Sequence, residues 1–247
     1  MKVQFILHSS FLVEFEEAMF IFDYYDGELT LPEGKAIYFF VSHKHGDHFN
    51  LNIFEFAKKY KNITYILPND MKRSDKYLER HRVCEEAREH ILYVRKSQEV
   101  SITNRIQMQT LKSTDEGVAY LITYQDVKRQ KPVVIYHAGD LNWWTWKGEE
   151  EQFEKKMEAD FKVEIDKLIG QEIDLAFLPL DPRQEERFFW GFDYFARKVG
   201  AKNLIPMHMW EDYSVIKRLK AIEKATEYKD RIIDITQQGQ WLKLREE

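Results

Sequence analysis

Short hydrophobic segments separated by polar residues fill the first half of the chain. They are rich in Phe, Ile, Val and Tyr, a composition typical of β-strands. The segment 36–42 is almost entirely apolar, as expected for a strand that is buried on both faces. We expect strands at residues 2–7, 10–15, 18–23, 36–42, 63–67, 90–95, 105–111, 118–124 and 132–140.

Apolar residues at helical spacing follow and separate these strands, and Asn50 is placed to cap the first such segment. We expect helices at residues 51–60, 73–90, about 149–169, 192–200 and 214–226, and later strands at 173–181, 203–210 and 231–236. No Pro-, Gly- or Ser-rich linker divides the chain, and no repeat of fixed period occurs. The pattern predicts a single α+β domain over residues 1–247, with two sheets and helices on the outside.

Composition and charge narrow the function classes. The chain is 44% hydrophobic, enough to bury a core, and its 37 basic and 42 acidic residues give a net charge of −5. Nucleic-acid-binding domains usually carry a basic excess, so we expect no nucleic-acid partner. Cys84 is the one cysteine, which excludes an intrachain disulfide and favours a reducing compartment. No signal peptide is evident, and no run reaches the roughly 18 apolar residues of a membrane span. We therefore expect a soluble cytoplasmic protein without membrane contact.

Three histidines and an aspartate are crowded into the stretch "HKHGDH" directly after the predicted strand 36–42. His43 and His45 are two residues apart, so they face the same way at the end of an extended strand. Asp47 and His48 follow Gly46, which can supply an unusual backbone turn. Imidazole nitrogens and carboxylate oxygens are the ligands of Zn²⁺ and, less selectively, of Mn²⁺ or Fe²⁺. The stretch therefore predicts a metal site.

The H-x-H-x-D-H motif resembles that of the metallo-β-lactamase fold superfamily. More narrowly, "LHSSFLVEF" and "FIFDYYDG" are similar to the branch of metal-dependent hydrolases that includes ascorbate-phosphate lactonase-like proteins, and the resemblance covers essentially the whole chain. It implies a four-layer αββα sandwich with one or two divalent metal ions at one edge of the sheets. Zinc is the first expectation, with manganese or iron as alternatives.

Two further segments match the family pattern. "IYHAGDLN" resembles the segment whose aspartate bridges two metals, which implies that role for Asp140, and "LIPMHMW" resembles the late strand with the final histidine, here His208. The resemblance implies that a metal-bound hydroxide, oriented by Asp47, attacks a carbonyl or phosphoryl centre. Asp47 is also expected to pass a proton to the leaving group. A lactone, ester, thioester, amide or phosphodiester would be the substrate, and the resemblance does not choose among them.

One histidine of the family pattern is missing. The family usually supplies it between the first cluster and the bridging aspartate, but this chain has none between His90 and His137. Asp115, in "LKSTDEGVAYLI", is the obvious substitute, with Thr114 and Ser113 as weaker candidates. A carboxylate there would favour Mn²⁺ or Fe²⁺ somewhat. The alternative is that Asp115 only closes a turn, for which Ser-Thr-Asp-Glu-Gly is also suited.

Three more polar residues follow predicted strands near the same region. His8 resembles the family's early His-(Ala/Ser)-Ser/Cys motif and either lines the pocket or packs. His137 either orients a ligand or belongs to the core. Asp23 follows "FIF", where the family often has an aspartate that supports the histidine loop.

The late part of the chain offers softer candidates. Asp181 and Arg183 lie after a predicted strand, where they either meet an anionic substrate group or form a surface ion pair. The tryptophans of "NWWTW", Trp143, Trp144 and Trp146, either wall a pocket, form a subunit contact or pack in the core. No substrate-binding residue is assigned.

The leading interpretation is a metal-dependent hydrolase of a small-molecule substrate. The chain has no Gly-rich phosphate loop and no G-x-S-x-G nucleophile motif, and Cys84 lies in a charged helical pattern that does not suit a catalytic cysteine. Two alternatives stay open, an RNA-processing nuclease of the same fold and a non-catalytic metal- or ligand-binding relative that has lost one metal. A redox role would need a ligand set richer in carboxylates. Whether the protein is a homo-oligomer also stays open.

Overall fold

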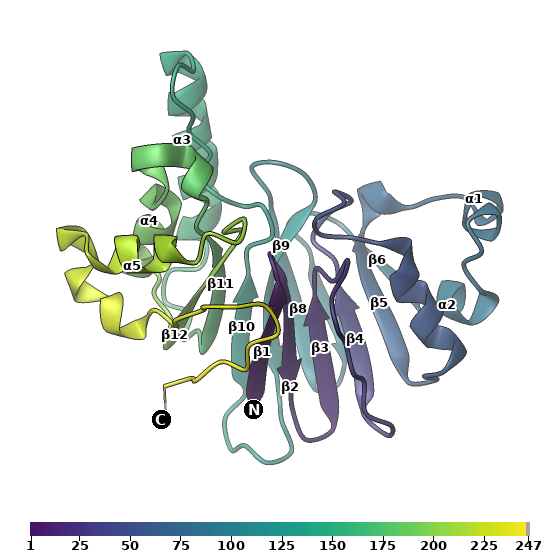
Figure 1. Ribbon diagram of the computed structural model, residues 1–247. Helices are drawn as coiled ribbons and strands as arrows, with labels where there is room; N and C mark the ends of the chain where they lie inside the picture. Colours follow the sequence, from purple (N-terminus) through teal and green to yellow (C-terminus); the bar gives the residue numbers. More distant parts are fainter. Residues whose placement is uncertain (246–247) are drawn as a thin grey trace.

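The computed structural model describes residues 1–245 and shows two mixed β-sheets with helices on their outer sides (Figure 1). The first sheet has six strands in the order of the sequence, antiparallel from β1 to β3 and parallel from β3 to β6. Its strands are β1 (Lys2–Leu7), β2 (Ser10–Glu14), β3 (Ala18–Phe22), β4 (Ala36–Phe40), β5 (Ile63–Pro68) and β6 (Ile91–Val94).

The second sheet also has six strands, in the order β12-β11-β10-β9-β8-β7. It is antiparallel from β7 to β10 and parallel from β10 to β12. Its strands are β7 (Glu99–Thr103), β8 (Ile106–Lys112), β9 (Val118–Tyr124), β10 (Val133–His137), β11 (Leu175–Pro179) and β12 (Asn203–Met207).

Helices form the two outer layers, as Figure 1 shows on either side of the sheets. The first sheet is covered by η1 (Leu51–Lys58), η2 (Asn69–Met71), α1 (Asp75–Arg80) and α2 (Glu85–Glu89). The second sheet is covered by α3 (Glu151–Asp166), η3 (Pro182–Arg187), α4 (Trp190–Lys198), α5 (Ser214–Lys220), η4 (Glu223–Glu227) and η5 (Lys229–Arg231). No helix within residues 1–245 is long and apolar enough to cross a membrane. The layers confirm the predicted α+β sandwich.

Aromatic side chains fill the space between the sheets. Alternate residues of β2 and β3 point inward, and the ring of Phe11 lies 4.5 Å from that of Phe177 on β11. Phe22 stacks on His137 of β10, with 4.9 Å between ring centroids. Because such rings bury a large apolar area, this core fixes the distance between the two sheets and so between the loops at their ends.

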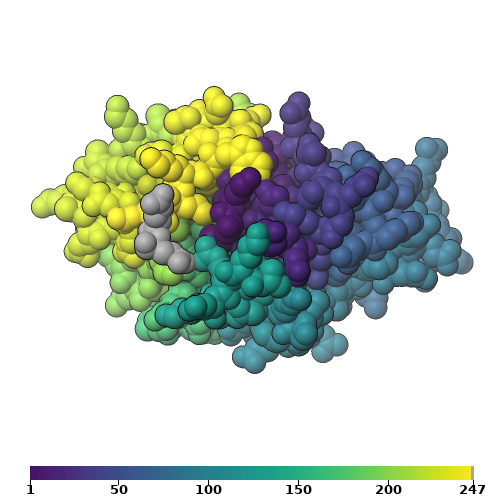
Figure 2. Space-filling view, turned by 90° about the horizontal axis from the view of Figure 1, so that it is seen from below, coloured from purple at the N-terminus to yellow at the C-terminus, as the bar shows by residue number. Residues whose placement is uncertain are grey.

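The C-terminal segment closes the edge of the first sheet. Phe5 N–H donates to the Gln240 carbonyl (2.9 Å), and Leu242 N–H donates to the Val3 carbonyl (2.8 Å). Figure 2 shows this segment (yellow) against the N-terminal strand (purple). An exposed strand edge invites pairing with other chains, so this segment protects β1.

The sequence-based expectations differ from the structure in several places, among them the predicted helix 214–226, which is divided into α5 and η4. The predicted helix 73–90 is two short helices, because Arg82 adopts a left-handed conformation (φ 60°) between them. The segment 51–60 forms a 3-10 helix, capped by Asn50 as predicted. The predicted strand 231–236 makes only an isolated bridge, from Ile232 to Leu204. The edge strand β7 was not predicted, since it is short and only Val100 and Ile102 among its residues are apolar.

Candidate metal centre

The candidate site lies where strands of both sheets end. His8 follows β1 and His43 follows β4, while Asp140 and His208 follow β10 and β12 of the other sheet. All four strands present their carboxyl ends at the same edge of the sandwich. Ligands commonly bind in such a crevice outside the carboxyl ends of parallel strands. The topology thus brings together side chains that are up to 200 residues apart, His8 and His208.

Two glycines let neighbouring loops approach residues 42–48, the histidine loop, closely. Gly117 has φ +69°, and a Cβ atom there would lie 1.9 Å from the Ser42 carbonyl oxygen. Gly139 has φ +51°, and its Cβ would lie 2.5 Å from Ser42 Cβ. Only glycine adopts these conformations without strain. Ser42, the residue before His43, is therefore held between the β8–β9 loop and the loop that carries Asp140.

Asp23 holds the histidine loop in place through hydrogen bonds. Its fully buried carboxylate accepts hydrogen bonds from Ser42 N–H (2.6 Å), Ser42 Oγ (2.7 Å) and His48 Nδ1 (2.8 Å). Burial alone would raise the pKa of Asp23, but His137 and His48 outweigh it and lower the pKa to about 2. The carboxylate is thus ionised and fixes His48 with Nε2 facing the site. The expected supporting role of Asp23 matches this geometry.

Asp181 fixes the orientation of His208, as Asp23 does for His48. Its buried carboxylate lies 3.0 Å from His208 Nδ1 and 2.9 Å from Arg183 Nε. Burial would raise the pKa of Asp181, yet His208 and Arg183 lower it to about 2. The Arg183 guanidinium also lies over the Trp210 ring, 4.3 Å from its centroid. Asp181 therefore orients His208, a role that the sequence did not indicate.

Asp140 stands between the histidines of both sheets. One carboxylate oxygen, Oδ1, lies 3.3 Å from His48 Nε2 and 3.5 Å from His208 Nε2. The other, Oδ2, lies 3.5 Å from His43 Nε2. The two oxygens thus face different histidine groups, which is the arrangement that a bridging carboxylate requires. These histidines lower the pKa of Asp140 although burial acts in the opposite direction.

Several buried polar atoms at this point make no well-aligned hydrogen bond within residues 1–245, although they lie as close as 3.3 Å to other ligating atoms of the site. They include His8 Nε2, His48 Nε2 and Asp140 Oδ1. Buried polar atoms are normally paired, because an unmet hydrogen bond costs about 1–3 kcal/mol. Three groups in the described chain each bring their ligating atoms within 4.8 Å of one another: His8, Asp47, His48 and His208; His43, His48 and Asp140; and His45, Asp115 and Asp140.

This donor set fits a divalent cation. Neutral imidazole and carboxylate are the ligands that zinc, manganese and iron accept, and a cation would pair the unmatched atoms. Burial alone would lower the pKa of His48, but Asp140 and Asp23 raise it to about 9. Burial lowers the pKa of His43 to about 4. The negative carboxylates therefore attract positive charge to the site. A divalent metal ion carries two positive charges, whereas one proton carries one.

The stretch that should hold the missing histidine is a turn. Ser113 Oγ accepts from the Asp115 N–H (3.1 Å), and Thr114 Oγ1 donates to the Asn142 carbonyl (2.6 Å). Both hydroxyl groups are therefore engaged in hydrogen bonds with the backbone of these loops. The Asp115 carboxylate lies 4.0 Å from His45 Nδ1, and Glu116, which the sequence did not indicate, lies 3.6 Å from His45 Nε2. Burial and the nearby Asp140 raise the pKa of Asp115.

Asp47 and His8 lie on the open side of the centre. Asp47 Oδ2 is 3.3 Å from His8 Nε2 and 3.9 Å from His48 Nε2. The His8 ring lies 4.3 Å from that of His208, and its backbone carbonyl accepts from the His208 N–H (3.2 Å). Burial would raise the pKa of Asp47, but His8 and His48 lower it. His8 thus borders the site, as one of its two sequence-based interpretations proposed.

The remaining sequence candidates take supporting positions. His137 is buried, with its Nδ1 accepting from Gly139 N–H (3.2 Å) and its Nε2 3.2 Å from the Ser9 carbonyl oxygen. Trp144 donates through Nε1 to the Asp140 carbonyl (2.9 Å), so it steadies the loop of Asp140. Trp143 packs away from the site, against Phe161 and Trp190, and Trp146 stacks on Trp144.

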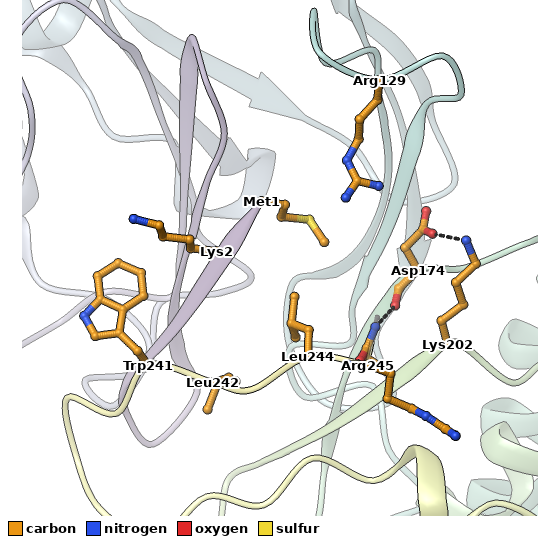
Figure 3. A pocket seen from close by; sticks show the side chains of 10 residues that line it. Met1, Lys2, Arg129, Asp174, Lys202, Trp241, Leu242, Leu244 and Arg245 are labelled. Atoms are coloured by element: carbon orange, nitrogen blue, oxygen red, sulfur yellow. Dashed lines mark hydrogen bonds and ion pairs between the residues drawn. The ribbon is translucent and has the colours of Figure 1, made fainter. Parts of the chain in front are cut away.

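A separate hollow of about 720 Å³ lies at the opposite end of the sheets (Figure 3). It is bordered by the starts of β1 and β12 and by the C-terminal segment, with Trp241 on one side. Asp174 and Lys202 form an ion pair there (2.7 Å). No histidine or cysteine is among its described lining residues, so it lacks the donor set of the candidate metal centre.

Comparison with known proteins identifies the fold. No protein-family model matches the chain, and no curated protein matches its sequence. Among solved structures, the novel metallo hydrolase Igni18 from the archaeon Ignicoccus hospitalis has a TM-score of 0.59 at 12% identity, covering 97% of this chain and 96% of its own. The isothiocyanate hydrolase from Delia radicum gut bacteria has a TM-score of 0.53 at 14% identity and covers 99% of both chains.

The short form of human tRNase Z has a TM-score of 0.52 at 15% identity, covering 85% of this chain and 92% of its own. At these identities the likeness establishes the fold. The chain therefore has the metallo-β-lactamase fold that the histidine motif predicted, and structures with this fold include metal-dependent hydrolases.

Proposed function

We propose that the protein is a metal-dependent hydrolase of a small-molecule substrate. The observation that carries the proposal is the convergence of ligating atoms, several of them buried and without a well-aligned hydrogen bond, on one point at the carboxyl ends of strands from both sheets. Structural neighbours described as hydrolases support it. The narrower resemblance to lactonase-like proteins places lactones and esters first among the substrates to be tested.

The proposed ligands divide into two groups that share Asp140. Following the family pattern, we place His43 and His45 in the first group with Asp115, and Asp47, His48 and His208 in the second; in the structure His43 also lies close to His48 and Asp140. With Asp140, each group contains two histidines and two carboxylates, a ligand set that zinc accepts. The carboxylate of Asp115 makes manganese or iron better suited to the first group than it would be to a site of histidines alone.

When bound, the cation would lower the pKa of the water that it holds and would place positive charge beside the reacting oxygen. Asp47 is placed to accept a proton from the attacking water, because its carboxylate is ionised and partly open to solvent. His8, 3.3 Å away, holds that carboxylate in position. In ester hydrolysis a C–O bond forms to the water oxygen, the bond to the leaving oxygen breaks, and Asp47 returns the proton to the leaving group.

The nuclease alternative has less support. Human tRNase Z shares the fold, but phosphate backbones are bound through Lys and Arg. The nearest lysine in the histidine loop, Lys44, is paired with Glu116 (2.9 Å), and the chain has a net charge of −5. The non-catalytic alternative rests on the missing histidine, and Asp115 faces His45 in its place.

Metal analysis combined with a substrate panel tests the proposal. The panel contains p-nitrophenyl acetate, an N-acyl homoserine lactone and bis(p-nitrophenyl) phosphate. We expect one to two equivalents of metal and metal-dependent hydrolysis of an ester or lactone, and expect His48→Ala to lose the tightly bound equivalent together with the hydrolysis. His90→Ala is the matched control, since His90 is exposed and lies outside the three groups. A protein that binds no metal, or whose His48→Ala variant binds as much, would refute the proposal.

A further inference from the structure

An apolar groove begins at the candidate metal centre. It has a volume of about 630 Å³ and runs from the histidine loop across η1 to β5, β6 and α1. His45, one of the proposed ligands, lines its inner end. Small-molecule sites are typically about 300–1,000 Å³ and mostly apolar. The groove is therefore large enough for a substrate group whose reacting bond lies beside His45.

The floor of the groove consists of hydrophobic side chains from four elements. Phe54 of η1, Leu67 of β5, Met71 of η2 and Leu78 of α1 are buried. Leu51 is half-buried at the start of η1. Because these positions come from separate elements that pack against one another, the floor is part of the hydrophobic core of this layer and is formed without a ligand.

The charged residues of the groove all carry the same sign. Lys44 stands at the inner end and Arg73 at the outer end, and no Asp or Glu is among the described lining residues. Lys44 is bound to Glu116, while Arg73 donates to the backbone carbonyls of Asp70 and Lys72. An uncharged or anionic apolar group fits this lining, whereas a cationic one does not.

We propose that this groove binds the acyl chain of the substrate, so that the enzyme prefers esters, thioesters or lactones of medium-length fatty acids. The proposal rests on the proposed hydrolase function for the reaction, but not for binding of the chain. Transfer of each methylene into an apolar site is worth about 0.8 kcal/mol, or roughly a fourfold change in affinity. A polar backbone such as RNA gains nothing from such a surface.

Binding is tested first, on metal-stripped protein. The fluorescent probe 11-(dansylamino)undecanoic acid is added and then displaced by butanoate, hexanoate, octanoate and decanoate. We expect displacement to strengthen by up to about 16-fold for each two carbons added. Equal displacement by butanoate and decanoate, or no probe binding, would overturn the groove assignment whether or not the protein is a hydrolase.

Two variants locate the binding. Leu51→Glu places a charge in the groove wall, and because acidic residues are favourable in the first turn of a helix, it should leave η1 folded. Tyr77→Ala removes an exposed ring at the groove margin. We expect at least a tenfold loss of decanoate affinity in Leu51→Glu and a smaller loss in Tyr77→Ala. Phe153→Glu, at an exposed position on α3, is the matched control and should bind as the parent does.

Turnover then separates this inference from the proposed function. For p-nitrophenyl esters, kcat/KM should rise from acetate to octanoate in the parent, and the rise should vanish in Leu51→Glu while acetate hydrolysis persists. Hydrolysis with a flat chain-length profile that Leu51→Glu leaves unchanged would refute the acyl groove and leave the hydrolase proposal standing. Chain-length-dependent binding without hydrolysis of any ester would do the reverse.

Discussion

The two halves of the candidate metal centre are held in different ways. In the half around His48 and His208, each histidine is buried and bound through Nδ1 to a buried carboxylate, Asp23 or Asp181. In the half around His45, His43 is buried as well, with its Nδ1 2.9 Å from Ser42 Oγ, but the His45 side chain is 43% exposed and its neighbours Asp115 and Glu116 are 45% and 38% exposed. The first half is fixed before any cation arrives, and the second is partly open to solvent through His45 and its acidic neighbours.

This difference predicts the order of metal binding. A preorganised ligand set loses little conformational entropy when it binds, whereas exposed side chains must be ordered first. Partners that fix metal-ligating histidines also tune the ligands and raise metal affinity. We therefore expect the half around His48 to bind the first equivalent of metal more tightly, and the half around His45 to bind the second weakly.

Replacement of Asp47 by Ala should have the largest effect, because it removes the proposed proton acceptor of the buried half. General acid–base groups contribute about 10²–10⁴-fold to rate, so we expect kcat on the best ester of the panel to fall by that factor. The Asp47 side chain is 29% exposed, so the melting temperature should change little. Full activity in a folded Asp47→Ala variant would exclude this role.

The close approach of the Asp115 loop to the histidine loop can be broken at Gly117. Alanine there would meet the Ser42 carbonyl and would also require a strained φ of +69°. We expect Gly117→Ala to lower the free energy of unfolding by about 2–5 kcal/mol, measured by urea denaturation. Gly148 has φ +91° and open space around it, so Gly148→Ala reports the strain alone. Equal losses in both variants would show that the approach to Ser42 does not matter.

The buried anchors offer a sharper test of the comparison. Asp23→Asn keeps the shape of the side chain but removes the charge that orients His48. We expect affinity for the first metal equivalent to fall by about 10–100-fold, measured by competition with a chromogenic chelator. Asp174→Asn is the control, because Asp174 is a buried carboxylate at the opposite end of the sheets. Equal losses in both would indicate a general effect on stability.

Much of this centre was predictable because its motif is local. His43, His45, Asp47 and His48 lie within six residues, so their shared purpose is visible without knowledge of the fold. Strands such as β4 were equally clear, because a strand buried on both faces is an unbroken apolar run. For these parts, sequence neighbours are also neighbours in space.

Other features depend on which strands become neighbours. Asp181 contacts His208 only because β11 and β12 are adjacent and parallel. The sequence around each residue gives no indication that the two form a pair. The edge strand β7 offers only two apolar residues, Val100 and Ile102, and the break at Arg82 depends on one left-handed residue in a helical pattern. Asp115 is intermediate, since its loop was identified but its orientation toward His45 required the tertiary structure.

Asp115 should have the smallest effect, confined to the second equivalent of metal. If its carboxylate is a ligand, Asp115→Ala leaves His43, His45 and Asp140 in the first group, and three protein ligands are enough for many zinc sites. We therefore expect the second equivalent to bind roughly tenfold more weakly, while the first equivalent, held by the buried half, is unchanged. Isothermal titration with Zn²⁺ and with Mn²⁺ measures both steps.

Two further variants separate ligation from a role in the turn. Asp115→His should restore or raise affinity for zinc and lower that for manganese, because imidazole suits zinc better than it suits manganese. Glu116→Ala removes a carboxylate that also lies near His45 but is paired with Lys44, so it should weaken the second step less. An unchanged second step in Asp115→Ala would assign Asp115 to the turn alone. The open half would then bind metal through its two histidines and Asp140, or not bind it at all.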